Sequence, residues 1–256
     1  ALSMDRLAFT SLAAVQSQSE IRAQITNAMA NVSTVGFKES YEVATESVKI
    51  DGAGYESRFQ PSVHKRDVIS LAPGTISMTG NPLDVALMDK TVLGIQADNG
   101  EIGFTRRGDL RVSANGVIEN SVGHLVLGEA GPITVPQGQL VTVSPDGTLY
   151  AKSLVEPETP AIEIGKLMLR DASETKLIRR EDGLFEPMDL EFRGTDFPTG
   201  PLVASLQSGG LEGSNVNPIE TMVKMMDFSR SFEAQIKMIT EAKSLDENGS
   251  SMMRLP

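Results

Sequence analysis

The chain has 256 residues, 40% of them hydrophobic and 22% charged, which is enough for one large or two modest domains with a real core. Its net charge of −11 at neutral pH disfavours a nucleic-acid partner, and no apolar run approaches the roughly 18 residues that membrane insertion requires. The absence of cysteine excludes disulfides, thiol catalysis and sulfur-ligated metal sites.

The first predicted element is one long helix. Residues 4–31 contain neither glycine nor proline, and Leu7, Ala14 and Ile21 recur at seven-residue spacing as part of a heptad stripe. Because several members of the stripe are small or polar, it lets neighbouring helices approach closely. We therefore expect residues 4–38 to form an N-terminal assembly helix.

A β-rich outer domain is predicted for residues 83–210, after an extended bridging segment at residues 39–82. Short runs of alternating apolar residues are interrupted by turn signals such as Asn115-Gly116 and Asp146-Gly147. These dipeptides favour the positive φ angles that tight hairpins require. The spacing of the turns indicates an all-β meander or a small barrel-like domain.

The last predicted element, in residues 211–256, is a second assembly helix. Asn217 is a suitable N-cap, because Pro218 follows at the first helical position and Glu220 faces the exposed amides. Asn248-Gly249 is expected to end the helix. Large apolar residues recur along it at spacings of three and four: Met222, Met225, Phe232, Ile236 and Ile239.

These elements predict an α+β fold, in which long N- and C-terminal helices flank an all-β central domain and pair as a coiled-coil-like assembly module. Neither helix has an obvious place inside the β core, so the stripes are free to pair with each other or with other chains. Half of the twelve methionines follow position 219, and methionine packs adaptably against different surfaces. The alternative interpretation of the second stripe is an ordinary core helix.

No catalytic or cofactor motif is recognisable in the chain. It contains no phosphate-binding loop, no dinucleotide-binding glycine motif, no H-E-x-x-H and no G-x-S-x-G elbow, and His64 and His124 are the only histidines. The basic clusters at residues 64–66, 106–107 and 179–180 are short and flanked by acids, so we interpret them as solvated strand ends. We predict a protein that is not an enzyme and has no cofactor or metal.

Three segments of the chain carry sequence motifs. Residues 25–38 read ITNAMANVSTVGFK, residues 82–86 and 104–108 read PLDVA and FTRRG, and residues 211–217 read LEGSNVN. In this order they resemble the signatures of the axial rod and hook proteins of the bacterial flagellum. Two departures from the family pattern occur: Ala28 stands where the family usually has asparagine, and residues 88–91 replace a segment that normally contains glycine.

The resemblance implies a structural subunit of the proximal rod that self-assembles through its terminal helices into a hollow, torque-transmitting shaft. It implies a periplasmic location in the basal body, reached by flagellar type III export without a cleaved signal peptide. The implied partners are copies of the chain, neighbouring rod proteins and the export apparatus. The alternatives are a distal-rod or hook-type axial protein or, in a different class, a monomeric β-rich periplasmic module that binds glycan.

The predicted assembly interface consists of the two helix stripes together with polar, glycine and aromatic positions of the first and third motifs. Its members are Leu7, Ala14, Ile21, Ile25, Asn27, Asn31, Val32, Gly36, Phe37, Asn215, Asn217, Met222, Met225, Phe232, Ile236 and Ile239.

Overall fold

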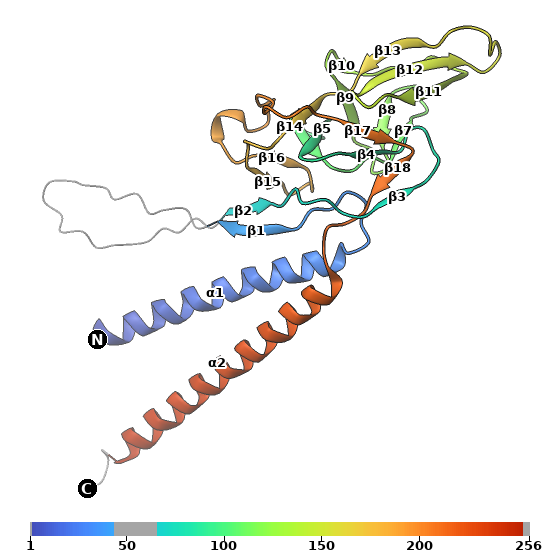
Figure 1. The fold of residues 1–256 in the computed structure, drawn as a ribbon. Coiled ribbons are helices and arrows are strands. Elements are labelled where there is room, and N and C mark those ends of the chain that lie inside the picture. The colour runs from blue at the N-terminus through green and yellow to red at the C-terminus, as the bar shows by residue number, and fades with distance from the viewer. Residues whose placement is uncertain (1, 44–65, 253–256) are drawn as a thin grey trace, which may run out of the picture. The chain divides into compact units, whose positions relative to one another are not determined.

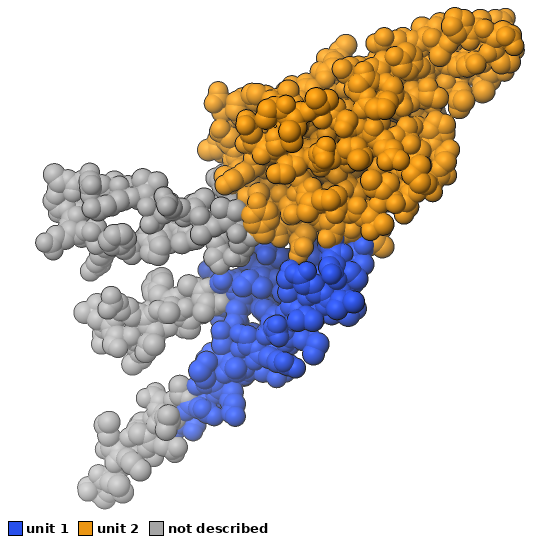
Figure 2. All heavy atoms as spheres, viewed as in Figure 1, with its two compact units in different colours: residues 1–32, 216–256 blue, residues 33–215 orange. Residues whose placement is uncertain are grey.

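The computed structural model describes residues 2–43 and 66–252 (Figure 1), including the side chains of residues 15–41, 67–241, 243 and 244. The chain divides into two compact units (Figure 2). Unit 1 combines the two ends of the chain, residues 1–32 and 216–256, and unit 2 comprises residues 33–215. The finer four-part division predicted from the sequence stays a prediction.

Unit 1 contains two helices, α1 (Leu2–Ala30) and α2 (Pro218–Met252). The predicted cap is confirmed, because the Asn217 side-chain oxygen accepts hydrogen bonds from the backbone N–H groups of Ile219 at 3.0 Å and Glu220 at 3.3 Å. The predicted stop at residues 248–249 is wrong, since α2 continues through it; one glycine costs a helix only about 1 kcal/mol relative to alanine. Neither helix has an apolar stretch long enough to cross a membrane within the described residues.

The predicted fold class is wrong. The described chain is mostly β, with only two α-helices, and these do not form a coiled coil. The side chains expected at the seam remain exposed to solvent, with 54% of Met222, 43% of Phe232, 49% of Ile236 and 60% of Ile239 accessible. A polar pair, the Gln18 amide donating to the Gln235 side-chain oxygen, links the helices instead. The small and polar members of the first stripe offer too little apolar surface to bury large residues of the second.

Unit 2 holds the strands. Their bounds are β1 (Ser40–Val43), β2 (Arg66–Ile69), β3 (Ile76–Met78), β4 (Val85–Leu87), β5 (Thr91–Gln96), β6 (Ile102–Thr105), β7 (Leu110–Val112), β8 (Ile118–Asn120), β9 (Leu125–Gly128), β10 (Gly131–Pro132), β11 (Gln139–Val143), β12 (Thr148–Ser153), β13 (Ile162–Lys166), β14 (Leu169–Asp171), β15 (Leu177–Arg179), β16 (Phe185–Pro187), β17 (Leu206–Ser208) and β18 (Gly210–Glu212), with a short 3-10 helix η1 (Leu190–Phe192).

The main sheet has 11 strands in the order β1-β2-β15-β16-β6-β5-β9-β8-β7, with β10 paired to β9 and β14 paired to β5. Three smaller sheets, β11-β12-β13, β17-β4 and β18-β3, complete the unit (Figure 1). The predicted hairpin turns are present: Gly116 joins β7 to β8 and Gly147 joins β11 to β12, both at positive φ. The predicted meander is wrong, because β5 lies between β6 and β9, and β16 returns from far along the chain to pair with β6.

The core of unit 2 lies on both sides of β5, which is buried almost throughout. Leu93 and Ile95 belong to one apolar cluster with strands β4, β7–β9 and β11–β12, whereas Val92 belongs to a second cluster with Phe104 and Phe185. This placement follows from the alternation of side chains along a strand.

Candidate functional site

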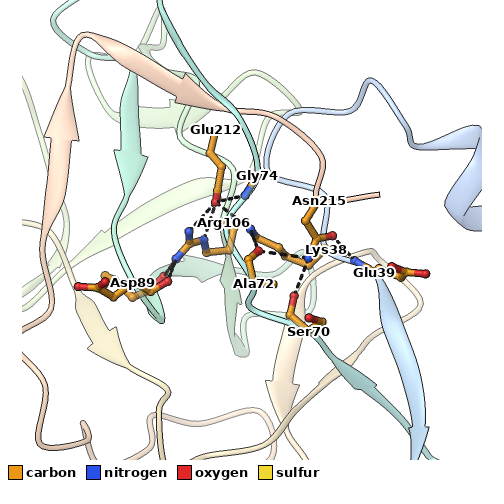
Figure 3. A network of polar contacts seen from close by, with 10 residues as sticks. Lys38, Glu39, Ser70, Ala72, Gly74, Asp89, Arg106, Glu212 and Asn215 are labelled. Carbon is orange, nitrogen blue, oxygen red and sulfur yellow. Dashed lines mark hydrogen bonds and ion pairs between the residues drawn. The ribbon is translucent and has the colours of Figure 1, made fainter. Parts of the chain in front are cut away.

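Three charged side chains form a buried network within unit 2 (Figure 3). Lys38, Arg106 and Glu212 are 0%, 1% and 2% exposed. The Glu212 carboxylate accepts from Lys38 Nζ at 2.8 Å, from Arg106 Nε at 2.9 Å and from Arg106 Nη2 at 2.8 Å. It also accepts from the backbone N–H of Gly74 at 2.9 Å. One carboxylate thus binds two cations and one backbone amide, without solvent contact.

The cations of this network also satisfy backbone carbonyl groups. Arg106 Nη1 donates to the carbonyl oxygens of Asp89 at 2.8 Å and Thr91 at 2.9 Å, and Lys38 Nζ donates to that of Ala72 at 2.7 Å. Asp89 has a φ of 47°, the only positive value for a residue other than glycine in the described chain. It lies in residues 88–91, the segment noted above for its departure from the resembled pattern, and Arg106 holds its left-handed turn through the carbonyl.

Asn215 ties the same region together through its side chain and its backbone. Its side-chain oxygen accepts from the Glu39 N–H at 2.7 Å, and its amide nitrogen donates to the carbonyls of Ser70 at 3.0 Å and Ala72 at 3.2 Å (Figure 3). Its own N–H donates to the Phe37 carbonyl at 3.2 Å. Asn215 therefore joins three separate stretches of chain, at residues 37–39, 70–72 and 215.

Gly36 allows the first of these stretches to approach the β core. It has a φ of 64°, and its N–H donates to the Glu212 carbonyl at 2.8 Å. A Cβ atom at this position would lie 2.6 Å from the Arg106 carbonyl carbon and oxygen and from the Arg107 nitrogen, which is closer than van der Waals contact permits. Only glycine combines the left-handed conformation with this close approach.

Phe37 is covered by Arg179. The Arg179 guanidinium carbon lies 4.3 Å from the centre of the Phe37 ring, and the guanidinium donates to the Lys38 carbonyl. Burial lowers the pKa of Arg179 below its ordinary value despite the nearby Asp67 charge. The stacked guanidinium closes this side of the network with a cation–π contact.

The electrostatics of the network favour a charged carboxylate. Burial alone would raise the pKa of Glu212, but hydrogen bonds and charge from Arg106, together with Lys38 and the Gly74 N–H, hold that pKa below its ordinary value. Burial and the neighbouring Arg106 charge lower the pKa of Lys38 to about 8. Near neutral pH the network therefore contains one anion bonded to two cations.

The network is suited to holding chain segments together. Residues 33–39 follow α1 in sequence and residues 210–215 precede α2. The two segments are bonded to each other, and Glu212 of the second is bonded to Arg106 in the loop before β7. The polar atoms of Lys38 and Glu212 bind protein groups and point inward, so they present no reactive group to a substrate. We call Gly36, Lys38, Arg106, Glu212 and Asn215 the junction network.

The structure places the predicted N-terminal interface residues as follows. Leu7 and Ala14 lie in α1, in the stretch whose side chains fall outside the described residues. Ile21 and Ile25 are half-buried, and Asn31 donates from its amide to the Asn27 carbonyl and side-chain oxygens, both at 2.8 Å, at the end of α1. Val32 is half-buried, whereas Gly36 and Phe37 are buried in unit 2.

The predicted C-terminal interface residues fall into two groups. Asn215 belongs to the junction network and Asn217 caps α2. The members within α2 are exposed, except for the half-buried Met225: they are Met222, Phe232, Ile236 and Ile239. Other apolar side chains of α2 that the sequence analysis did not select are equally accessible, among them Ile219 at 73% and Met226 at 55%.

Sequence reasoning missed the three charged members of the junction network. Residues 106–107 were interpreted as a solvated strand end, but Arg106 is buried while Arg107 points outward to Asp109 at 2.8 Å. Lys38 and Glu212 belong to the first and third motifs, and neither is among the predicted interface residues. The available signal is that the first and third motifs each carry a single charged residue beside apolar or small ones, and that these two charges have opposite signs.

Across residues 2–43 and 66–252, no group of three or more histidine, aspartate or glutamate side chains is arranged to hold a metal ion. His64 lies outside the described residues, and Asp84 binds the Thr79 hydroxyl at 2.5 Å and the Asn81 amide at 3.3 Å. The Asp84 carboxylate therefore fixes the turn that precedes β4.

Comparison with known proteins identifies relatives over nearly the whole chain. The family model "Flagellar basal body rod FlgEFG protein C-terminal" matches residues 207–252, and "Flagellar hook protein FlgE/F/G D1 domain" matches residues 91–151. The flagellar basal-body rod protein FlgF of Salmonella typhimurium is 36% identical over 96% of both chains, and FlgF of Escherichia coli is 33% identical over 98% of both. FlgG of Buchnera aphidicola from Baizongia pistaciae is 26% identical over 86% of this chain and 89% of its own.

Proposed function

The chain belongs to the FlgE/F/G family of flagellar basal-body rod proteins, and we propose from this premise how it works as a structural subunit of the proximal rod. Two relatives named FlgF share 33% and 36% of its residues over almost their full length. In this role the chain has no catalytic activity. Its work is done by surfaces that bind neighbouring subunits and by a fold that resists deformation.

Association takes place through the exposed apolar side chains of α2. The observation that carries this proposal is that eight large apolar residues of α2 remain 43–73% exposed in an acidic chain: Ile219, Met222, Val223, Met226, Phe232, Ile236, Met238 and Ile239. Exposed apolar area of this kind marks a surface that another protein covers. Each large side chain that becomes fully buried contributes about 1.5–3 kcal/mol, so a few of them suffice for association between subunits.

The junction network gives the subunit its stiffness. Charged hydrogen bonds among buried groups fix the relative geometry of their backbones more tightly than apolar contacts do, because each bond has a direction. Here they hold the segment after α1, the segment before α2 and the loop that carries Arg106 in one block. A rigid block at this point lets unit 2 transmit torque to the chain segments that lead to the helices.

The family supports a proposal for the partners and the location. We extend the proposal to binding of other copies of the chain and of neighbouring rod proteins, to passage through the flagellar type III export apparatus without a cleaved signal peptide, and to a periplasmic position in the basal body. The sequence-based interface on α1, including Ile21 and Ile25, stays part of this proposal.

The test compares two charge substitutions on α2 in a motile strain whose only copy of the chain is the variant. Phe232→Glu replaces an exposed apolar side chain of α2 by a carboxylate. Lys237→Glu introduces a carboxylate at a polar position five residues further along the helix and about 140° around it. We expect the first to abolish rod assembly and swimming, and the second to leave both near the unsubstituted level.

Folding is monitored alongside. Urea unfolding of the purified Phe232→Glu chain should match that of the unsubstituted chain, because Phe232 lies outside unit 2. Normal swimming of the Phe232→Glu strain would refute assembly through this face, and equal loss in both strains would show that any added charge on α2 is harmful.

A further inference from the structure

The apolar residues of α2 lie on two different faces. With 100° between successive residues, Met225, Phe228 and Phe232 share the side on which Gln235 bonds to Gln18 of α1. A second face, turned about 120–180° from the position of Gln235, is apolar only in the opening turns of the helix. We call it the outer face; its members are Ile219, Met222, Val223 and Met226, which are 73%, 54%, 50% and 55% exposed.

Two thioethers form half of the outer face. Met222 and Met226 are one turn apart, so their sulfur atoms occupy neighbouring positions on the helix surface. The chain contains neither cysteine nor tryptophan, which leaves methionine as its most readily oxidised side chain. By contrast, Met168 is only 5% exposed within the second apolar cluster of unit 2.

We propose that Met222 and Met226 form an oxidation site through which peroxide switches off association of the outer face. The inference rests on the proposed function, because the outer face is one part of the exposed apolar surface of α2 through which subunits associate, separate from the side that carries Phe232. Exposure makes the two sulfur atoms accessible to an oxidant before assembly. Because they lie on an apolar face, converting them to polar sulfoxides opposes burial of that face. Once a neighbouring subunit covers the face, the same atoms are shielded from the oxidant.

The chemistry needs only a peroxide. A lone pair of the thioether sulfur attacks one oxygen of hydrogen peroxide, the O–O bond breaks, and an S–O bond forms. The sulfur is oxidised by two electrons to a sulfoxide, and the second oxygen leaves as water after proton transfer. The sulfoxide oxygen is a strong hydrogen-bond acceptor, and burying it against apolar side chains without a donor is unfavourable.

The experiment treats the purified full chain with hydrogen peroxide and follows two quantities. Mass spectrometry measures the oxidation rate of each methionine, and sedimentation velocity measures self-association. We expect Met222 and Met226 to oxidise at least tenfold faster than Met168, and the treated chain to self-associate at least tenfold more weakly. Met222→Leu/Met226→Leu, which keeps the apolar face, should associate equally well with and without peroxide.

A matched control comes from unit 2. Met78 in β3 is 66% exposed but lies outside the outer face, so Met78→Leu should remain as sensitive to peroxide as the unsubstituted chain. Unchanged association of a chain oxidised at both sites would overturn the proposal, as would full sensitivity of the double leucine variant. If sedimentation velocity shows no self-association of the untreated chain, the proposed self-assembly itself is refuted. That result differs from a failure of the oxidation proposal, in which the untreated chain associates and oxidation has no effect.

Discussion

Unit 2 and α2 differ in which kind of side chain is buried and which is exposed to solvent. In unit 2, the charged side chains of Lys38, Arg106 and Glu212 are almost completely buried, whereas large apolar side chains of α2 are about half exposed. The usual distribution is the reverse in both places. The buried charges are satisfied by groups of the same chain, at distances of 2.8–2.9 Å.

The difference shows which part of the molecule is complete in one chain. A buried carboxylate with two cations and an amide as partners needs nothing further, so unit 2 can reach its final structure alone. The apolar side chains of α2 gain their stabilisation only when another surface excludes water from them. The same subunit thus combines a domain whose buried groups are satisfied within the chain with an apolar helix surface that a neighbouring subunit must cover.

The largest expected effect comes from removing the anion of the junction network. Glu212→Ala leaves Lys38 and Arg106 buried without a counter-charge, and loss of one partner in such a network costs about 3–5 kcal/mol. The free energy of unfolding of the full chain, measured in urea, should fall by this amount.

The matched control is an exposed ion pair of the same length. Arg111 and Glu119 also lie 2.8 Å apart, but the Arg111 side chain is 57% exposed. Arg111→Ala should cost less than about 1 kcal/mol, because water screens the pair. Equal losses in the two variants would contradict the role given to burial.

The second prediction concerns the close approach that brings the network together. Gly36→Ala must adopt a left-handed conformation and place its Cβ 2.6 Å from the Arg106 and Arg107 backbone. We expect a loss of about 2–4 kcal/mol in unfolding free energy. Gly80→Ala has a similar φ of 75° but open space around it, so it isolates the conformational part of the cost. A Gly36→Ala chain as stable as Gly80→Ala would show that the contact can relax.

The third prediction uses acid. The folded chain holds the pKa of Glu212 below its ordinary value, so the carboxylate contributes stability above that value and loses it as the pH falls through the folded pKa. The gap in unfolding free energy between the unsubstituted chain and Glu212→Gln should therefore narrow below about pH 4.5, by at most about 1.4 kcal/mol per pH unit. A gap that stays constant down to pH 3 would show that the pKa is not lowered.

The smallest expected effect is a gain. Asp89 adopts a φ of 47° while its carbonyl accepts from Arg106. Asp89→Gly removes the steric cost of the left-handed conformation and keeps the carbonyl, so the unfolding free energy should rise by up to about 1 kcal/mol. Urea unfolding measures it, and a loss instead would mean that the aspartate side chain itself supports the turn.

Local features of the fold were predictable from particular residues. Asn115-Gly116 and Asp146-Gly147 form the turns expected of them, because the positive φ is a property of the dipeptide. The Asn217 cap was likewise readable from three neighbouring residues. Each of these signals is carried within about four positions of sequence.

The remaining features depend on residues far apart in the chain. The pairing of β16 with β6 places Phe185 opposite Phe104, and the local sequence around either residue does not predict this pairing. Arg106 and Arg107 are the same residue type in the loop between β6 and β7, and only the partners brought by distant segments distinguish the first, which binds Glu212, from the second, which binds Asp109. The coiled-coil prediction is wrong because heptad spacing alone does not bury a stripe whose members, such as Ala14, are too small to cover the large apolar residues of α2.

Hydrogen exchange, compared between the purified chain and assembled rods, tests the central claim most directly. A helix whose apolar residues have no partner is marginally stable, so amides of α2 should exchange quickly in the purified chain and slowly in the rod. The Gly36 and Gly74 amides, which donate to Glu212, should be strongly protected in both. Protection of α2 in the purified chain as strong as that of these amides would contradict the account, because α2 would then need no neighbouring subunit.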